Sequence, residues 1–275
     1  MNIPRPDGFK VDEVPGDYSR GECSHFTLLK RGWNTLDAVK LIAKKLKVSV
    51  KRFRVAGLKD KHAVTTQRVS AWRVPKKRLE GLDLKGIKIL DIKEGLERIS
   101  IGSHKGNKFR IVLEGVKELR KPVKVPNYFG KQRFGGNALL GKKLAESDWE
   151  GAVRLLNPRG SYERKVFSYL RKRPGDYLGA LKRVDKKIRR LWVNAWQSKQ
   201  WNQKLDTSKK TQELPSYKEI TGMPELGSFP GNERETIMKV KDYKIKKLKK
   251  GVELDFTLPS GCYATTLIDY ILKKH

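Results

Sequence analysis

Residues 57–67, which read GLKDKHAVTTQ, place one acidic side chain, Asp60, in an otherwise basic and polar stretch. Before this stretch, residues 52–56 alternate polar and apolar side chains as a half-buried strand does. After it, residues 65–74 are rich in β-branched side chains and again partly alternate. The pattern therefore predicts that Asp60 lies on a loop between two strands.

The charges beside Asp60 favour an ionised carboxylate. Lys59 and Lys61 flank the acid and His62 follows it, and nearby positive charge lowers the pKa of a carboxyl group. An ionised carboxylate can act as a nucleophile or as a general base. The alternative that the pattern leaves open is an ordinary solvated Lys-Asp-Lys turn.

The loop around Asp60 resembles the signature loop of the TruD family of RNA pseudouridine synthases. Four further stretches resemble family motifs in the family's order, so the resemblance extends across nearly the whole chain. The chain departs from the family pattern at Ile3, where a lysine often stands, and Arg5 is the candidate replacement. The four stretches are FKVDE at 9–13, KRGWNT at 30–35, NYFGKQRFG at 127–135 and LPSGCYAT at 258–265.

This resemblance implies an enzyme that isomerises a uridine in tRNA or another structured RNA to pseudouridine, with uridine 13 of the tRNA D-arm as the first candidate. The reaction breaks the bond between ribose and uracil N1 and rejoins the ribose to C5. It consumes no metal, redox agent or nucleotide, so we expect no cofactor. The resemblance implies that Asp60 is the reacting carboxylate, which attacks the ribose or the base or removes a ribose proton.

The same resemblance implies four substrate-binding residues near the catalytic acid. It places Phe129 beside the acid as an apolar wall or stacking group for a base turned out of the RNA, and Asn127 where it contacts the nucleotide or braces the loop. Tyr263 matches an aromatic position of a family motif, and Lys59 either neutralises a phosphate or lowers the pKa of the acid. The patterns alone also fit a turn packed on the sheet for Asn127 and Phe129, and core packing for Tyr263.

Strand-like and helix-like stretches are mixed without strict alternation, which predicts an α+β fold rather than a doubly wound one. The resemblance implies a mainly antiparallel catalytic sheet flanked by helices, with a mostly helical and basic insertion that is usually larger in the family. We expect the catalytic domain at residues 1–136 and 251–275, where a last strand and helix return to the sheet. The insertion is expected at residues 137–250.

Two local patterns within these domains lead to further expectations. The turn at residues 103–107 is expected to join a β-hairpin. Apolar side chains at helical spacing predict a buried stripe through the insertion, and residues 207–231, rich in Pro, Gly and Ser, predict a loop. The stripe comprises Leu139, Leu140, Leu144, Trp149, Val153, Leu156, Ile188, Leu191, Trp192, Ala195 and Trp196.

The chain of 275 residues carries 62 Lys and Arg against 30 Asp and Glu, which gives a formal net charge of +32. Charge of this sign attracts phosphate polymers, so nucleic acid is the expected partner. A merely basic or heat-adapted protein is the alternative, although heat adaptation usually raises Glu together with Lys. Two distant cysteines indicate no disulfide framework, and the lack of a long uncharged apolar run predicts a soluble, cytoplasmic protein without a membrane partner.

Other site patterns fail on physical grounds. Residues 136–143 imitate a phosphate-binding P-loop, but Lys143 stands where a magnesium-binding hydroxyl is needed. The four histidines are scattered without ligand spacing, so we expect no metal site. Two other functions stay open: a non-catalytic RNA-binding module on the same scaffold, and a metal-dependent nuclease, which would need clustered carboxylates.

The charge excess generates a first prediction. Binding to tRNA is expected to be tight at low salt and to weaken steeply as salt rises, because each phosphate contact releases counterions. Filter binding across a salt series measures this slope. A flat salt dependence would contradict the view that the Lys and Arg clusters contact RNA.

Overall fold

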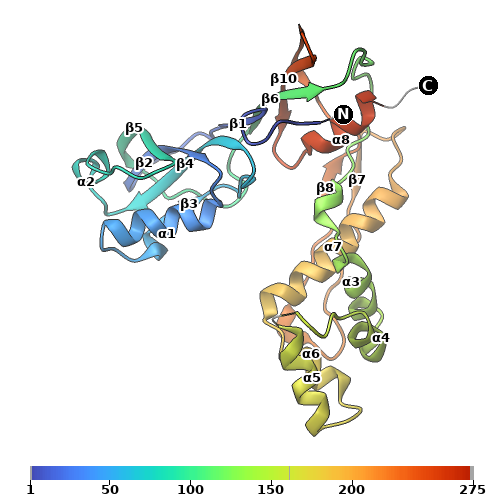
Figure 1. Cartoon of the computed structure of the whole chain (residues 1–275). Coiled ribbons are helices and arrows are strands. Elements are labelled where there is room, and N and C mark those ends of the chain that lie inside the picture. The colour runs from blue at the N-terminus through green and yellow to red at the C-terminus, as the bar shows by residue number, and fades with distance from the viewer. Residues whose placement is uncertain (1, 161, 273–275) are drawn as a thin grey trace. The chain divides into compact units, whose positions relative to one another are not determined.

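The computed structural model describes residues 2–160 and 162–272, which form two compact units (Figure 1). The first unit contains residues up to 123, residues 239–264 and the residues from 268 onward, and the second contains residues 124–238 and 265–267. These divisions differ from the expected breaks at 136/137 and 250/251. The later break differs because residues 241–248 form a strand of the first unit's sheet.

One sheet dominates the first unit, with the strand order β5-β2-β4-β1-β6-β10-β9 and with β3 paired to β4. Every pair is antiparallel except β1 with β4, which run parallel. The predicted α+β class with a mainly antiparallel sheet is therefore confirmed. The strands are β1 Phe9–Val14, β2 Arg20–Arg31, β3 Phe53–Val55, β4 Val64–Trp72, β5 Ile87–Leu96, β6 Gly106–Glu114, β9 Lys241–Leu248 and β10 Gly251–Pro259.

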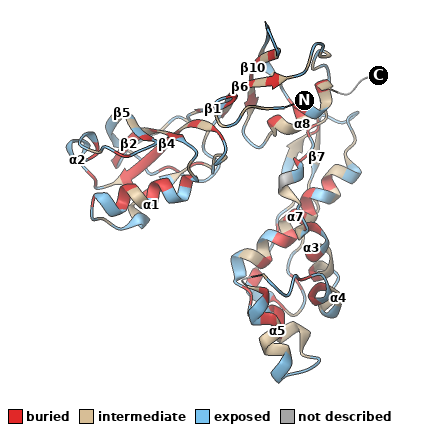
Figure 2. Ribbon diagram, viewed as in Figure 1, coloured by how far each residue is buried: buried red, intermediate tan, exposed pale blue. Residues whose placement is uncertain are grey.

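Helix α1, Thr35–Lys45, covers part of this sheet. The side chain of Asn34 caps it by accepting a hydrogen bond from the Leu36 amide at 2.9 Å. Its apolar positions recur at helical spacing, so one face packs with Phe26 and Val69 in a single core. Figure 2 shows buried residues in red along α1 and β4. The first unit also has the short helices η1 Val50–Arg52 and α2 Lys76–Glu80, and α8 Ala264–Leu272 follows β10.

The hairpin expected at residues 103–107 is wrong. Strand β5 pairs with β2, whereas β6 pairs with β1 and β10, so the two flanking strands are not neighbours. The segment between them crosses the sheet instead, because the Ile99 amide bonds to Ser70 Oγ at 3.1 Å and the Gly102 amide to the Ala56 carbonyl at 2.7 Å. The register of β6 with β10 runs from Gly106 opposite Pro259 to Glu114 opposite Gly251.

The second unit is mostly helical, as predicted for this region. Its core is built around Trp192, and the predicted stripe is buried at Leu144, Val153 and Leu156. Leu139 and Leu191 are exceptions, each 44% exposed. Its elements are η2 Lys131–Arg133, α3 Asn137–Ala145, α4 Trp149–Arg154, α5 Glu163–Lys172, α6 Tyr177–Leu181, α7 Lys186–Lys204, β7 Thr211–Glu213, η3 Pro224–Leu226 and β8 Glu233–Glu235.

Residues 207–231, expected as a loop, contribute more than a connection. They include β7, which pairs with β8, and the 3₁₀ helix η3. Their apolar side chains complete the core of the second unit, with Ile220, Met223 and Phe229 buried. Burial of these side chains orders a segment that its Pro and Gly content alone would leave irregular.

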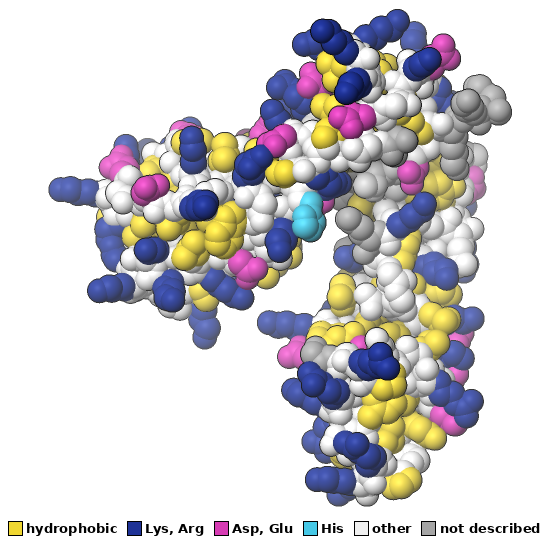
Figure 3. Space-filling model, in the orientation of Figure 1, with side chains coloured by type: hydrophobic (Ala, Val, Ile, Leu, Met, Phe, Trp, Pro, Cys, Tyr) yellow, Lys and Arg dark blue, Asp and Glu magenta, His cyan; other side chains and the backbone are white. Residues whose placement is uncertain are grey.

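Basic side chains spread over the visible surface of both units, and acidic ones are sparser (Figure 3). Within residues 2–160 and 162–272, no helix combines the length and apolar character that a membrane span requires.

Candidate active site

The loop that carries Asp60 lies between β3 and β4, as predicted. Strand β4 is interior to the sheet, with β2 on one side and β1 on the other, so the loop enters a strand that is held along both edges. The Asp60 side chain is 28% exposed. The carboxylate is therefore within reach of a ligand while the backbone beneath it is anchored.

Two groups bind the Asp60 carboxylate. Arg5 Nη1 donates to Oδ2 at 2.9 Å, and the amide of His62 donates to Oδ1 at 2.9 Å. The same Arg5 nitrogen also donates to the His62 carbonyl at 2.9 Å, and its guanidinium lies over the Phe9 ring at 4.2 Å. Arg5, the candidate replacement for the missing lysine, thus supplies the cation at the carboxylate.

These contacts set the charge of the acid. Burial by itself raises the pKa of the Asp60 carboxyl. The His62 amide, the Arg5 hydrogen bond and the charges of Arg5 and His62 outweigh it, so the pKa lies below its ordinary value. The carboxylate is therefore ionised at neutral pH, as expected from the sequence, although the cation is Arg5 rather than the flanking lysines.

Lys30, at the end of β2, holds the loop from beneath. Its side chain is fully buried, and Nζ donates to the carbonyls of Asp60 at 2.7 Å, Trp33 at 2.8 Å and Lys59 at 3.4 Å. Burial, together with the charge of Lys59, lowers the pKa of Lys30 to about 8, and the charge of Asp60 only partly opposes this. We did not single out Lys30 from the sequence, although it lies within the 30–35 motif.

Thr35 and Gln67 fasten the other side of the loop. Thr35 Oγ1 donates to Gln67 Oε1 at 2.9 Å and accepts from the Lys59 amide at 3.0 Å. Gln67 Nε2 donates to the Gly57 carbonyl at 2.9 Å. Both side chains are buried, so these bonds are shielded from competing water.

The Lys59 ammonium points to a buried acid on β1. Nζ lies 2.7 Å from Glu13 Oε2 and donates to Asn107 Oδ1 at 2.7 Å. Glu13 Oε1 accepts from the Arg68 amide of β4 at 3.0 Å, and the Lys59 and Glu13 side chains are only 7% and 0% exposed. In this structure Lys59 therefore ties the loop to the sheet and is engaged away from the Asp60 carboxylate.

The segment before Tyr263 is linked to the same side of the unit. The Ser260 amide donates to the Lys105 carbonyl at 3.2 Å, and Ser260 Oγ lies 3.2 Å from His104 Nε2. A Cβ added to Gly57 would lie 3.6 Å from His104 Cε1, so the His104 turn borders the loop. Tyr263 follows this turn and is half-buried.

Asn127 and Phe129 lie together in the second unit, whereas Asp60, Lys59 and Tyr263 belong to the first. Asn127 is 4% exposed; its Nδ2 donates to the Glu235 carbonyl at 2.8 Å and its Oδ1 accepts from Arg234 at 2.6 Å. The Phe129 ring is 9% exposed, edge-on to Trp201 and 4.3 Å from the Arg234 guanidinium carbon. Asn127 therefore braces the segment that carries Phe129.

Metal-binding residues do not gather in this region. Across the described residues, no group of three or more His, Cys, Asp or Glu side chains is placed to hold a metal ion.

Comparison with known proteins gives concordant results. The family model of tRNA pseudouridine synthase D (TruD) matches residues 4–157, 141–214 and 207–271. The tRNA pseudouridine synthase D of Geobacter metallireducens is 34% identical over 70% of this chain and 59% of that protein. The protein named "Probable tRNA pseudouridine synthase D" of Methanopyrus kandleri is 29% identical over 92% of this chain and 86% of that protein.

The fold also has a solved counterpart. The crystal structure titled "Putative tRNA pseudouridine synthase D (TruD)" from Methanosarcina mazei covers 98% of this chain and 93% of its own, with a TM-score of 0.71 and 23% identity. At this identity the similarity concerns the fold.

The buried ammonium of Lys30 generates a second prediction. Its pKa in the folded protein, about 8, is below the ordinary lysine value of 10.5, so the unfolded chain binds the proton more tightly at intermediate pH. Below about pH 8 the buried charge of Lys30 therefore destabilises the folded protein by its full amount. This destabilisation decreases as the pH rises from about 8 toward the pKa of the unfolded chain. The free energy of unfolding of wild type minus that of Lys30→Met should rise between pH 8 and 10, with a slope of at most about 1.4 kcal/mol per pH unit.

Urea unfolding of both proteins at each pH measures this difference in the free energy of unfolding. The groups that titrate in the same way in both proteins do not contribute to the difference. A difference that stays flat or falls over this pH range would show that Lys30 keeps an ordinary pKa.

Proposed function

The chain belongs to the TruD family of tRNA pseudouridine synthases, and we propose that it isomerises a uridine of tRNA to pseudouridine with Asp60 as the reacting carboxylate. The observation that carries the assignment of Asp60 is its setting: an ionised, partly exposed carboxylate on a loop whose backbone is fixed from both sides. Uridine 13 of the D-arm is the first substrate to test. The cytoplasm is the proposed site of action.

The reaction is an isomerisation, so every atom of the substrate is retained. The bond from ribose C1′ to uracil N1 breaks, the base turns, and C1′ bonds to C5, whose proton is released as N1 gains one. A carboxylate can assist by attacking the ribose or the base or by removing a ribose proton. Each of these roles requires the ionised form, which the Arg5 and His62 contacts support.

The fixed loop backbone serves this chemistry. A reacting group contributes most when its position is set before the substrate arrives. Bonds from Lys30 and Thr35 hold the peptide units on either side of the acid, while the carboxylate itself keeps 28% of its surface exposed. The hydrogen bonds that fix the loop thus reach its backbone, and the carboxylate remains accessible to a substrate.

Binding of the RNA rests on charge and on access to the base. A base in folded RNA must be turned out of its stack before a carboxylate can reach it, and an aromatic group can hold it there. We propose that Phe129 serves the nucleotide in this way, that Asn127 braces the Phe129 segment, and that Tyr263 and Lys59 complete the binding residues. For Lys59 the proposed contribution is indirect, through the loop it anchors to Glu13.

Replacement of Asp60 tests the proposal directly. Asp60→Asn keeps the shape of the side chain but removes its charge, so pseudouridine formation should fall by roughly three orders of magnitude or more while tRNA binding persists. The measurement incubates each protein with unmodified tRNA and maps pseudouridine by chemical labelling.

A chelator in the same assay separates the rival functions. Wild-type activity with chelator present would argue against a metal-dependent nuclease. Wild type without pseudouridine formation in any tRNA would instead favour a non-catalytic RNA-binding module. Equal rates for wild type and Asp60→Asn would remove Asp60 from the reaction.

Phe129 generates a further prediction. Phe129→Leu keeps an apolar side chain against Trp201 but loses the aromatic face, and one stacking contact contributes about 1–3 kcal/mol. The single-turnover rate should fall roughly 5- to 150-fold, while overall tRNA affinity changes little because many phosphate contacts remain.

Tyr128→Leu is the matched control, because Tyr128 is the neighbouring aromatic residue and is 39% exposed. Its rate should stay near that of wild type. If Phe129→Leu lowers the melting temperature but leaves the rate unchanged, Phe129 is a packing residue only.

A further inference from the structure

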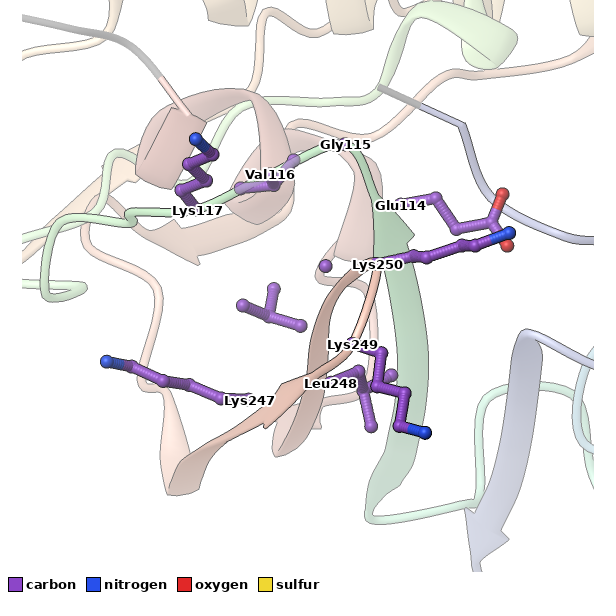
Figure 4. Close-up of a pocket in the computed structure, with 10 residues that line it drawn as sticks. Glu114, Gly115, Val116, Lys117, Lys247, Leu248, Lys249 and Lys250 are labelled. Carbon is purple, nitrogen blue, oxygen red and sulfur yellow. The ribbon is translucent and has the colours of Figure 1, made fainter.

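A hollow of about 680 Å³ lies at one end of the first unit's sheet, where β6 ends and the β9–β10 hairpin turns (Figure 4). Residues 114–117 form one wall and residues 247–252 the other; we call it the lysine hollow. Lys117, Lys247, Lys249 and Lys250 are four of its ten lining residues. Leu248, which is 37% exposed, contributes apolar surface between them.

The lysine hollow lies at one end of β6 and β10, and the His104 and Ser260 turns beside the Asp60 loop lie at the other end. Gly251, at the hollow, pairs with Glu114, whereas Pro259 pairs with Gly106 beside the His104 turn. The eight residue steps of β10 between these ends span roughly 27 Å at the rise of a strand. A phosphate group held in the hollow is therefore remote from Asp60, but one sheet fixes the two positions relative to each other.

Three of the four lysines at the hollow lack an ion-pair partner in the described part of the chain. In the described residues, no acidic side chain lies within 4 Å of the ammonium of Lys117, Lys247 or Lys249. All three side chains are exposed. The one acid among the lining residues, Glu114, accepts a hydrogen bond from Asn2 Nδ2 at 3.0 Å. Like charges around one depression repel each other, and a polyanion relieves that repulsion.

Protection of a sheet edge explains only part of this pattern. Strand β9 is an edge strand, and lysines on an edge discourage pairing with another chain. Lys249 and Lys250 lie beyond the strand in the turn, and Lys117 comes from a different segment, so edge protection does not account for them. Lysines from two separate segments border this one hollow, which favours an anionic ligand.

We propose that the lysine hollow binds backbone phosphates of the RNA substrate at a point remote from Asp60. This inference rests on the proposed function for the identity of the RNA. The lysines contact phosphates as point charges, and the exposed apolar surface of Leu248 accommodates the adjoining ribose or base. Such a contact adds affinity and orientation without taking part in the reaction.

Charge reversal at the hollow tests this proposal. Lys247→Glu/Lys249→Glu is compared with Lys88→Glu/Lys93→Glu, which reverses two exposed lysines on β5, the edge strand at the opposite side of the sheet. Both variants change the net charge equally. The hollow variant should bind unmodified tRNA about tenfold more weakly, and its slope of log affinity against log salt should be smaller by roughly 1.4–1.8.

The control variant should keep a slope close to that of wild type. At saturating protein, the single-turnover rate of the hollow variant should match wild type. Lys247→Gln should lose affinity and Lys247→Arg should retain it, and unfolding curves of all variants establish that they are folded.

The outcomes separate the two proposals. Equal losses of tRNA affinity in the hollow and control variants would show an effect of net charge alone and would overturn the proposed RNA contact at the hollow. No loss of affinity in either variant would overturn it as well. A loss of affinity confined to the hollow variant would support the proposed RNA contact at the hollow. If wild type also forms no pseudouridine, the proposed function fails, but the RNA contact at the hollow is still supported. A lower single-turnover rate at saturating protein, with unchanged tRNA affinity, would also overturn the proposed RNA contact at the hollow.

Discussion

A buried ammonium group holds the loop on which the candidate site depends. Lys30 Nζ donates to three backbone carbonyls, of which two belong to Lys59 and Asp60. A buried charge is costly when it lacks partners, so any movement of the loop away from Lys30 leaves an unsatisfied ammonium behind. The cost of that movement keeps the Asp60 backbone in one place, and the depressed pKa of Lys30 shows that burial of the charge is only partly compensated.

The other two cations discussed near the loop, Lys59 and Arg5, have different roles. Lys59 binds Glu13 and Asn107 below the loop and so connects it to β1 and β6. Arg5 reaches the carboxylate from the N-terminal segment and favours its ionised form. Because the adjacent lysine is engaged elsewhere, the cation at the Asp60 carboxylate comes from a residue 55 positions away in the chain and acts together with the His62 amide.

The sheet of the first unit connects the surroundings of the Asp60 loop with the lysine hollow. Strands β6 and β10 carry the His104 and Ser260 turns at one end and the lysine hollow at the other. A paired ladder of nine residues is stiff, so both ends keep a constant separation. A basic surface alone attracts RNA without choosing its orientation, whereas the two proposed contact points, held by one sheet, would constrain it.

Local patterns by themselves determined much of this protein: the alternation of β1 and β10, the helical spacing and Asn34 cap of α1, and a basic loop with one acid at Asp60. These features depend on near neighbours in the chain, so a single sequence carries them. Only the tertiary structure decided that Lys59 pairs with Glu13, that Lys30 lies beneath the loop, and that β5 and β6 are not partners. The partner of a buried charge or a strand is set by which distant segments the sheet brings together, and neither spacing nor composition encodes that choice.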